Sequence, residues 1–140
     1  MKIIIRDYIS GDYPQIELLW KITGLGGAIR GDNQKIIENS LKIGGKFLVI
    51  EDIRNSKVIG TSWMTFDGRR LHLHHFGIDP KHQRHGYGKA LTEASLSFAK
   101  EKGIQIKLEV HKENLPAIEL YKSMGFQYLG DYDVYIIRNI

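Results

Sequence analysis

The chain has 140 residues, of which 42% are hydrophobic, and its formal net charge is +4. Its length predicts one domain, residues 1–140, with enough apolar side chains to bury a core. The absence of cysteine excludes disulfides, thiolate nucleophiles and cysteine-based zinc sites. No apolar run approaches the ~18 residues of a membrane-spanning helix, and the opening apolar residues are too few for a signal peptide. We therefore expect a cytoplasmic protein with no membrane partner.

The modest basic excess favours a nucleotide-like or acidic ligand. Basic residues alternate with acidic residues along most of the chain, and no long basic run occurs. This pattern argues against binding to nucleic acid.

The first third of the chain has the pattern of one strand and two helices. Residues 3–5 form a short apolar strand, and residues 10–12 are a helix-start signal that precedes apolar residues at helical spacing. The glycine-rich residues 24–27 should end this helix. Asp32 is expected to cap a second helix that continues to about residue 43.

The middle of the chain predicts three antiparallel strands and a crossover. Residues 47–50 and 58–66 form a hairpin, and a further turn leads into a strand at 71–78. A helix from about residue 86 to 102 then leads to a strand at 104–110. Because a strand–helix–strand connection joins parallel neighbours, the last two strands should be adjacent in the sheet.

After a short helix at 115–124, two final strands are expected at 126–131 and 134–137. The predicted fold is therefore α/β, with a central mixed sheet and helices on both of its faces. The final strands could also offer an edge for a homodimer.

One strand contains a change of parity. Leu71 and Leu73 lie on one face of a regular strand, whereas Phe76 and Ile78 would lie on the other. If all four face the core, an extra residue is inserted near positions 74–75, which predicts a β-bulge. The backbone groups left unpaired there could hydrogen-bond an extended, amide-bearing ligand. The alternative is a regular strand in which Phe76 faces away from Leu71.

A basic loop with two glycines follows this strand and opens the next helix. Its sequence is Gln83-Arg84-His85-Gly86-Tyr87-Gly88-Lys89. Glycine permits close approach of the backbone to a ligand, and N–H groups at a helix start favour an anion. The spacing matches neither the Walker pattern nor GxGxxG. The loop is a candidate phosphate site, and an ordinary basic loop at a helix start is the alternative.

Two sequence blocks resemble those of the GNAT superfamily of acetyl-coenzyme A-dependent N-acetyltransferases. The first, at 83–88, has the form Gln/Arg-x-x-Gly-x-Gly/Ala and follows a strand that ends Ile78-Asp79-Pro80. The second, at 114–126, has the form Asn-x-x-Ala-x-x-x-Tyr-x-x-x-Gly-Phe. The two blocks occur in the family's order around a predicted strand. The resemblance extends over nearly the whole chain, although its N-terminal third shares only the order of elements.

The resemblance implies acetyl-coenzyme A as cosubstrate. Its pyrophosphate would bind the loop, its pantetheine arm would lie beside the end of the preceding strand, and Asn114 would contact it where two strands separate. The residues implied in binding are Phe76, Gly77, Ile78, Arg84, His85, Gly86, Tyr87, Gly88, Lys89, Asn114 and Tyr121.

The implied reaction is direct transfer of an acetyl group to a primary amine in a ternary complex, since no cysteine can form an acyl-enzyme. Tyr121 matches the family's proton donor to the leaving thiolate, and a structural core tyrosine is the alternative. Glu109 is the candidate base, directly or through water, because Leu108-Glu109-Val110 resembles the ribosomal-protein alanine acetyltransferase branch. A solvated glutamate is the alternative. A backbone N–H near Ile78 would stabilise the oxyanion.

The histidines raise two further hypotheses. His72 and His74 would face the same side of a strand, but zinc sites normally use three or four protein ligands, so we expect no metal. His74 or His75, near the bulge, could instead deprotonate the amine.

The acceptor pocket is implied to lie at residues 24–31, between the first two helices. Arg30 could meet a carboxylate there, and Trp20 and Trp63 could line the pocket or pack in the core. The pair at 69–70 could contact a phosphate or an acidic substrate, or remain solvated. The acceptor is left open as a protein N-terminus, a lysine or a small amine. A non-catalytic acyl-coenzyme A-binding domain of the same fold is the alternative function.

Overall fold

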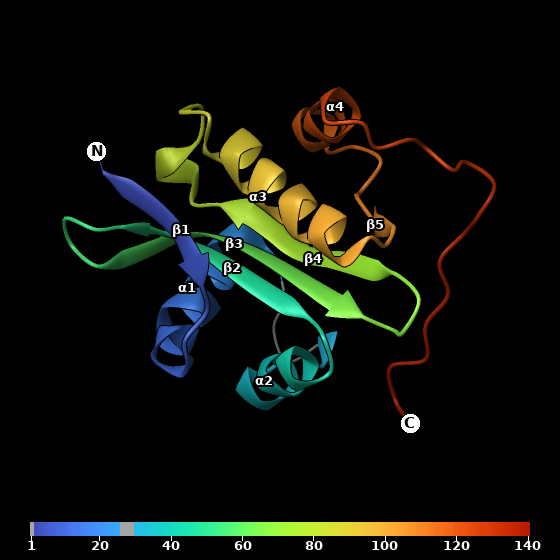
Figure 1. Ribbon diagram of the computed structural model, residues 1–140, viewed down its shortest axis with the longest axis horizontal. Helices are drawn as coiled ribbons and strands as arrows, with labels where there is room; N and C mark the ends of the chain where they lie inside the picture. Colours follow the sequence, from blue (N-terminus) through green and yellow to red (C-terminus); the bar gives the residue numbers. More distant parts are fainter. Residues whose placement is uncertain (1, 26–29) are drawn as a thin grey trace.

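Five strands form one sheet in the order β1-β2-β3-β4-β5 (Figure 1). The computed structural model describes residues 2–25 and 30–140. The elements in chain order are β1 Ile3–Asp7, η1 Ser10–Asp12, α1 Tyr13–Thr23, α2 Gln34–Lys42, β2 Lys46–Asp52, β3 Lys57–Phe66, β4 Leu71–Ile78, η3 Pro80–His82, α3 Tyr87–Lys102, β5 Ile106–Leu108 and α4 Leu115–Ser123. Within the described ranges, no helix is both long enough and apolar enough to cross a membrane.

The sheet is mixed. Strands β1 to β4 pair in antiparallel fashion with their neighbours, whereas β4 and β5 are parallel. Helix α3 makes the connection between these two strands, which confirms the expected crossover. Its C-terminus lies at Gly103, whose φ of 69° suits a residue without a side chain.

Helices cover both faces of the sheet, as expected (Figure 1). Helices α1 and α2 lie on one face, where they enclose an aromatic core that includes Trp20, Phe47 and Trp63. Helices α3 and α4 lie on the other face, over an aliphatic core that includes Leu71 and Leu91. Each fully buried side chain of this size stabilises the fold by about 1.5–3 kcal/mol relative to exposure.

The ends of the first two helices only partly match the sequence-based expectation. Helix α1 ends at Gly24, whose φ of 74° confirms a glycine stop, and Gly26 and Gly27 lie outside the described residues. The expected cap of α2 was wrong by one position. The side chain of Asn33, and not of Asp32, accepts the hydrogen bond from the Ile36 N–H at 2.9 Å. The carboxylate of Asp32 has a different partner, described below.

The bulge expected in β4 is present. Thr61 pairs with Gly77 and Trp63 pairs with His74, so two residues of β4 lie opposite the single residue Ser62. The extra residue is His75, whose φ of 46° is in the left-handed region. The insertion returns Phe76 to the face that packs against the aliphatic core, together with the leucines earlier in the strand.

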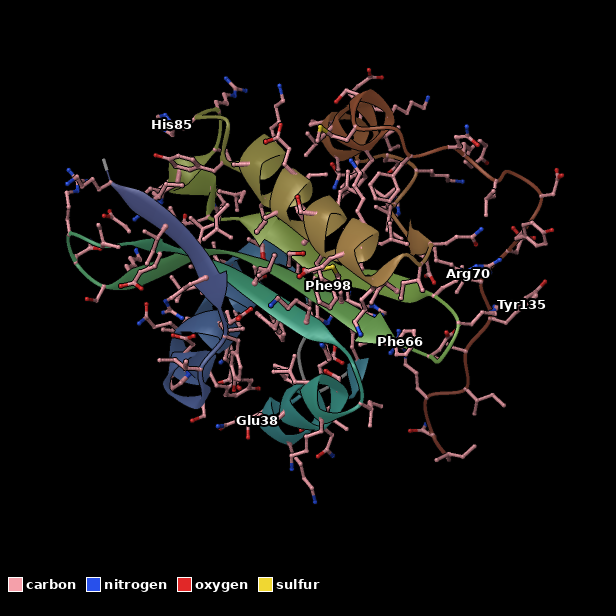
Figure 2. The ribbon with its side chains drawn as sticks, in the orientation of Figure 1. Glu38, Phe66, Arg70, His85, Phe98 and Tyr135 are labelled. Atoms are coloured by element: carbon pink, nitrogen blue, oxygen red, sulfur yellow. The ribbon has the colours of Figure 1, made fainter. Side chains whose placement is uncertain are left out.

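The last expected strands do not form. No helix or strand follows α4 in the described residues, and the segment at 126–140 runs past β5 without pairing (Figure 1). Phe126 packs against Tyr121, but the apolar side chains from Tyr128 onward stay exposed, and Tyr135 extends into solvent (Figure 2). The strand expected at 104–110 is shortened to Ile106–Leu108, although its half-buried positions still alternate. Alternation of apolar residues gives a strand only where a neighbouring edge can pair with it. The outer edge of β5 offers the segment at 126–140 only three residues.

Candidate active site

Strands β4 and β5 separate soon after they meet. Their parallel register covers only Leu71–Ile106, His72–Lys107 and Leu73–Leu108. From His74 onwards, the described part of the chain places no strand on that side of β4. The second half of β4 therefore presents main-chain groups along an open edge.

The basic loop is fixed to the end of β4. The main-chain N–H of Asp79 bonds to the carbonyl of Ile59 at 2.8 Å, and the Asp79 side chain accepts from the N–H of Lys81 at 2.9 Å. The Gln83 amide, the first residue of the motif, donates to the carbonyl of Ile78 at 3.1 Å. The motif glutamine thus joins the start of the loop to the last residue of the strand.

The loop itself faces solvent, and its backbone is bent. Gly86 has a φ of 80° and Arg84 a φ of 66°, both in the left-handed region. Residues 83–86 are exposed, and the main-chain N–H groups of Arg84, His85 and Gly86 make no hydrogen bond to another described residue. Helix α3 begins directly afterwards, so the positive end of its dipole lies beside them. This arrangement fits an anion such as a pyrophosphate.

Buried hydroxyl groups hold α3 in place. Ser62 of β3 and Ser95 of α3 are hydrogen-bonded at 2.8 Å between their Oγ atoms. The Thr92 hydroxyl donates to the carbonyl of Gly88 at 2.8 Å, in the first turn of the helix. The first contact fixes α3 relative to the sheet, and the second stabilises the first turn of the helix.

The two motifs meet in space. Helix α4 is capped by Asn114, whose side chain accepts from the N–H of Ala117 at 3.4 Å. A Cβ placed on Gly88 would lie 3.4 Å from Leu120 of α4. The ring of Tyr121 packs edge-on against Phe76, with 5.7 Å between ring centroids. Residues from both blocks and from the open edge of β4 are therefore neighbours.

Tyr121 is buried, with 8% of its surface exposed. Burial raises its pKa to about 12, so the phenol keeps its proton at neutral pH. Its hydroxyl makes no hydrogen bond within residues 2–25 and 30–140. The main-chain hydrogen bond expected of a purely structural core tyrosine is thus not observed among the described residues.

Glu109 lies on the opposite face of the sheet from α3. It follows β5 directly, 54% of its side chain is exposed, and its Oε1 is 3.5 Å from Nε2 of His72. Burial lowers the pKa of His72, and the carboxylate of Glu109 opposes this shift. The structure therefore places Glu109 beside an imidazole, on the same face as α1 and α2.

His74 stacks on His72, with ring centroids 4.4 Å apart. Its Nε2 is hydrogen-bonded to Thr65 Oγ1 at 2.9 Å, and burial lowers its pKa to about 4. In the described ranges, no group of three or more histidine, aspartate or glutamate side chains has an arrangement that could hold a metal ion.

His75 has a partner that sequence reasoning missed. Its Nε2 is 2.5 Å from Oδ2 of Asp32, which lies 43 positions earlier, just before α2. The imidazole also packs edge-on against Trp20, at 4.6 Å between centroids. No local pattern links the two residues, because the contact depends on the bulge and on the path of the chain into α2.

Other candidate residues do not join this site. Residues 69–70 form the β3–β4 turn, where their N–H groups bond to Asp67, and Figure 2 shows Arg70 and His85 at opposite ends of the molecule. Trp20 and Trp63 belong to the core and are each 3% exposed. Residues 26–29 of the expected acceptor loop lie outside the described residues, and Arg30 donates to the carbonyl of Gly24 at 3.4 Å.

Two surface depressions lie outside the site. One depression lies over the outer side of α2, and another lies beside the start of β2. Neither includes a residue of the two motifs. The site is therefore defined by the motifs and by the separated strands.

Comparison with known proteins agrees with this geometry. The family model described as "Acetyltransferase (GNAT) family" matches residues 17–126. The human protein N-acetyltransferase 8B is 33% identical over 111 residues, which are 74% of this chain and 48% of that relative. The chain thus spans about half the length of this curated relative.

Two solved structures share the fold. An acetyltransferase of the GNAT family from Staphylococcus aureus Mu50 has a TM-score of 0.79 and 22% identity, covering 90% of this chain and 84% of that one. A predicted acetyltransferase from Clostridium acetobutylicum, solved with acetyl-CoA, has a TM-score of 0.75 and 18% identity, covering 96% of each chain. With the family match over most of its length, the chain belongs to the GNAT family of acetyltransferases.

Proposed function

We propose that this protein transfers an acetyl group from acetyl-coenzyme A to a primary amine, by direct transfer in a ternary complex. One observation carries the proposal. The open edge of β4, the loop at its end and the buried Tyr121 meet at one place, through the contacts of Phe76 with Tyr121 and of Gly88 with Leu120.

The loop fits the diphosphate of the cosubstrate. Exposed N–H groups of residues 84–86 and the first turn of α3 supply donors, and Lys89 supplies positive charge beside them. Phe76, Gly77 and Ile78 would hold the pantetheine arm, with Asn114 on the far side of the opening. The bound thioester supplies an electrophilic acetyl carbon.

The chain's own groups would then manage the protons. Tyr121, protonated at neutral pH, would donate to the leaving sulfur, and a main-chain N–H near Ile78 would stabilise the oxyanion. A base must act on the acceptor ammonium from the face covered by α1 and α2. Glu109, with His72 beside it, is the candidate for this role that the sequence indicates. The proposal retains the expected cytoplasmic location and leaves open whether the amine belongs to a small molecule or to a protein.

A thiol-release screen tests the proposal. Acetyl-coenzyme A is offered with small amines, polyamines, amino acids and peptides with free N-termini, and calorimetry measures coenzyme A binding in parallel. We expect thiol release with at least one amine class. Binding without release for every amine class would favour the non-catalytic alternative, and absence of both would refute the proposed function.

The Tyr121→Phe variant tests the donor. We expect kcat to fall by roughly 100-fold or more while coenzyme A affinity is kept. Tyr8→Phe is the matched control, because Tyr8 is equally buried, in the other core, and its hydroxyl donates to Glu38 at 2.9 Å. Unchanged kcat in Tyr121→Phe would exclude Tyr121 as the acid.

A further inference from the structure

We propose that His75 is the base that takes the proton from the acceptor ammonium, and that Asp32 is the positioning residue that orients its ring. The inference rests on the proposed function and names a base that differs from Glu109. It is carried by the geometry of the pair, the strained position of His75 and its place relative to Tyr121.

The geometry of the pair is that of an oriented imidazole. The Nε2–Oδ2 distance is 2.5 Å, and the side chains of His75 and Asp32 are only 8% and 16% exposed. Trp20 packs against the edge of the ring and Trp63 lies on another side, at 5.5 Å between centroids. A carboxylate bonded to one ring nitrogen fixes the proton there and leaves the other nitrogen as the acceptor.

The second ring nitrogen is available. Nδ1 of His75 makes no hydrogen bond to the described residues. Among those residues, His82 Nδ1 is the one fully buried side-chain nitrogen or oxygen without a partner. The His75 side chain keeps 8% of its surface exposed, and the proposal requires the amine to reach Nδ1 there.

The position of His75 is strained, and the surrounding structure maintains it. A φ of 46° for a residue with a side chain costs about 1–2 kcal/mol. The backbone is held there by the Thr61 hydroxyl, which donates to the His75 carbonyl at 2.7 Å. Glycine would adopt this φ without strain. What histidine adds at this position, compared with glycine, is its imidazole.

The location places acid and base on opposite sides of one edge. His75 faces α1, whereas the next residue, Phe76, faces the other core and contacts Tyr121. A thioester held along the open edge would have Tyr121 on the side of its sulfur. The amine would approach from the side of α1 and α2, where His75 lies.

The pair is better suited to this role than Glu109. Glu109 is 54% exposed and lies 3.5 Å from His72, so water screens its charge. The titratable groups that face the dyad are His74, at 6.2 Å between ring centroids, and Tyr13 of α1, whose pKa is raised by burial, by Glu17 and, to a smaller extent, by Asp32.

The protons balance. The ammonium gives one proton to His75 Nδ1, which passes it to solvent, and the neutral amine attacks the acetyl carbon. The C–N bond forms, the C–S bond breaks, and the sulfur takes the proton of the Tyr121 hydroxyl. The second proton lost by nitrogen restores Tyr121. One amide, one thiol and one released proton result.

The main test is His75→Gly, a variant that removes the imidazole and suits the backbone at this position. With the amine found in the screen, we expect kcat to fall by roughly 100-fold, coenzyme A affinity by calorimetry to stay within about threefold, and added imidazole to restore part of the rate. Asp32→Asn should lower kcat by about tenfold and move the acidic limb of its pH profile to lower pH, because a negative charge beside the imidazole is lost.

Two further variants complete the test. Glu38→Gln removes a carboxylate that lies on α2 (Figure 2) and accepts a hydrogen bond from Tyr8, and it should leave kcat within about twofold. Glu109→Gln should have a smaller effect than His75→Gly. A rate in His75→Gly within threefold of wild type, a loss that imidazole does not restore, or a larger loss in Glu109→Gln would each overturn the inference while the proposed function stands. An inactive wild-type protein would instead overturn the proposed function.

Discussion

The hydroxyl of Thr61 connects Trp20 to His75. It accepts a hydrogen bond from the indole N–H of Trp20 at 3.0 Å and donates to the carbonyl of His75 at 2.7 Å. Thr61 is fully buried and lies in β3, where the register with β4 changes. One side chain therefore links the aromatic core to the bulge.

The Thr61→Val variant keeps the shape and removes both hydrogen bonds. We expect it to lower the free energy of unfolding by about 2–4 kcal/mol, because a buried N–H and a carbonyl lose their partner. Urea denaturation measures the loss. Thr92→Val is the control, since Thr92 is equally buried but bonds only to a carbonyl of its own helix. Equal losses in the two variants would show that the bulge does not depend on Thr61.

The Gly86→Val variant tests the loop. A side chain at a φ of 80° is strained and would also occupy the space that a diphosphate needs, so coenzyme A affinity should fall at least about tenfold. Gly103→Val is the matched control, because Gly103 has a φ of 69° at the other end of α3. Both variants should lose stability, but only the first should lose affinity. Unchanged affinity by calorimetry would refute the placement of the diphosphate.

The pKa of Tyr121 predicts a loss of stability at alkaline pH. Burial raises it to about 12 from the ordinary value of 10, so between pH 10 and 12 the unfolded chain loses this proton first. Ionisation then favours unfolding, and the contribution of about 2–3 kcal/mol present below pH 10 is lost as pH rises to 12. Urea unfolding at pH 9 and 11.5 should show a larger decrease for wild type than for Tyr121→Phe. Parallel decreases would contradict the assignment.

His74 predicts the opposite dependence at acidic pH. Burial lowers its pKa to about 4 from 6.5, so the folded state favours the neutral ring. Its contribution is present above pH 6.5 and is lost as pH falls towards 4, by about 3 kcal/mol at most. His74→Gln should therefore show a shallower decline in unfolding free energy between pH 6.5 and 4 than wild type. A decline of the same slope would contradict the prediction.

The features that the sequence predicted well have local causes. The parity of Leu71, Leu73, Phe76 and Ile78 left a bulged and a regular strand open, and the bulged one is correct because all four residues pack at one core. The start of α3 followed from the motif glycines, and Gly86 takes the left-handed conformation that only glycine adopts easily. Such signals need no knowledge of distant residues.

The features that were missed depend on partners far along the chain. Asp32 and Asn33 are both good residues to cap α2. The Asp32 carboxylate is hydrogen-bonded to His75, and Asn33 caps the helix instead. The strands expected at 126–131 and 134–137 have the right composition but lack a long neighbouring edge. The cofactor-binding and catalytic roles of individual residues remain predictions.

The early separation of β4 from β5 has a practical consequence for mutagenesis. A ligand laid against that exposed stretch would be recognised through amides and carbonyls, which every amino acid shares. Alanine scanning of residues 76–78 should thus underestimate how strongly they hold it. Proline, which deletes an N–H, or ester-for-amide replacement would expose contributions that conventional scanning hides.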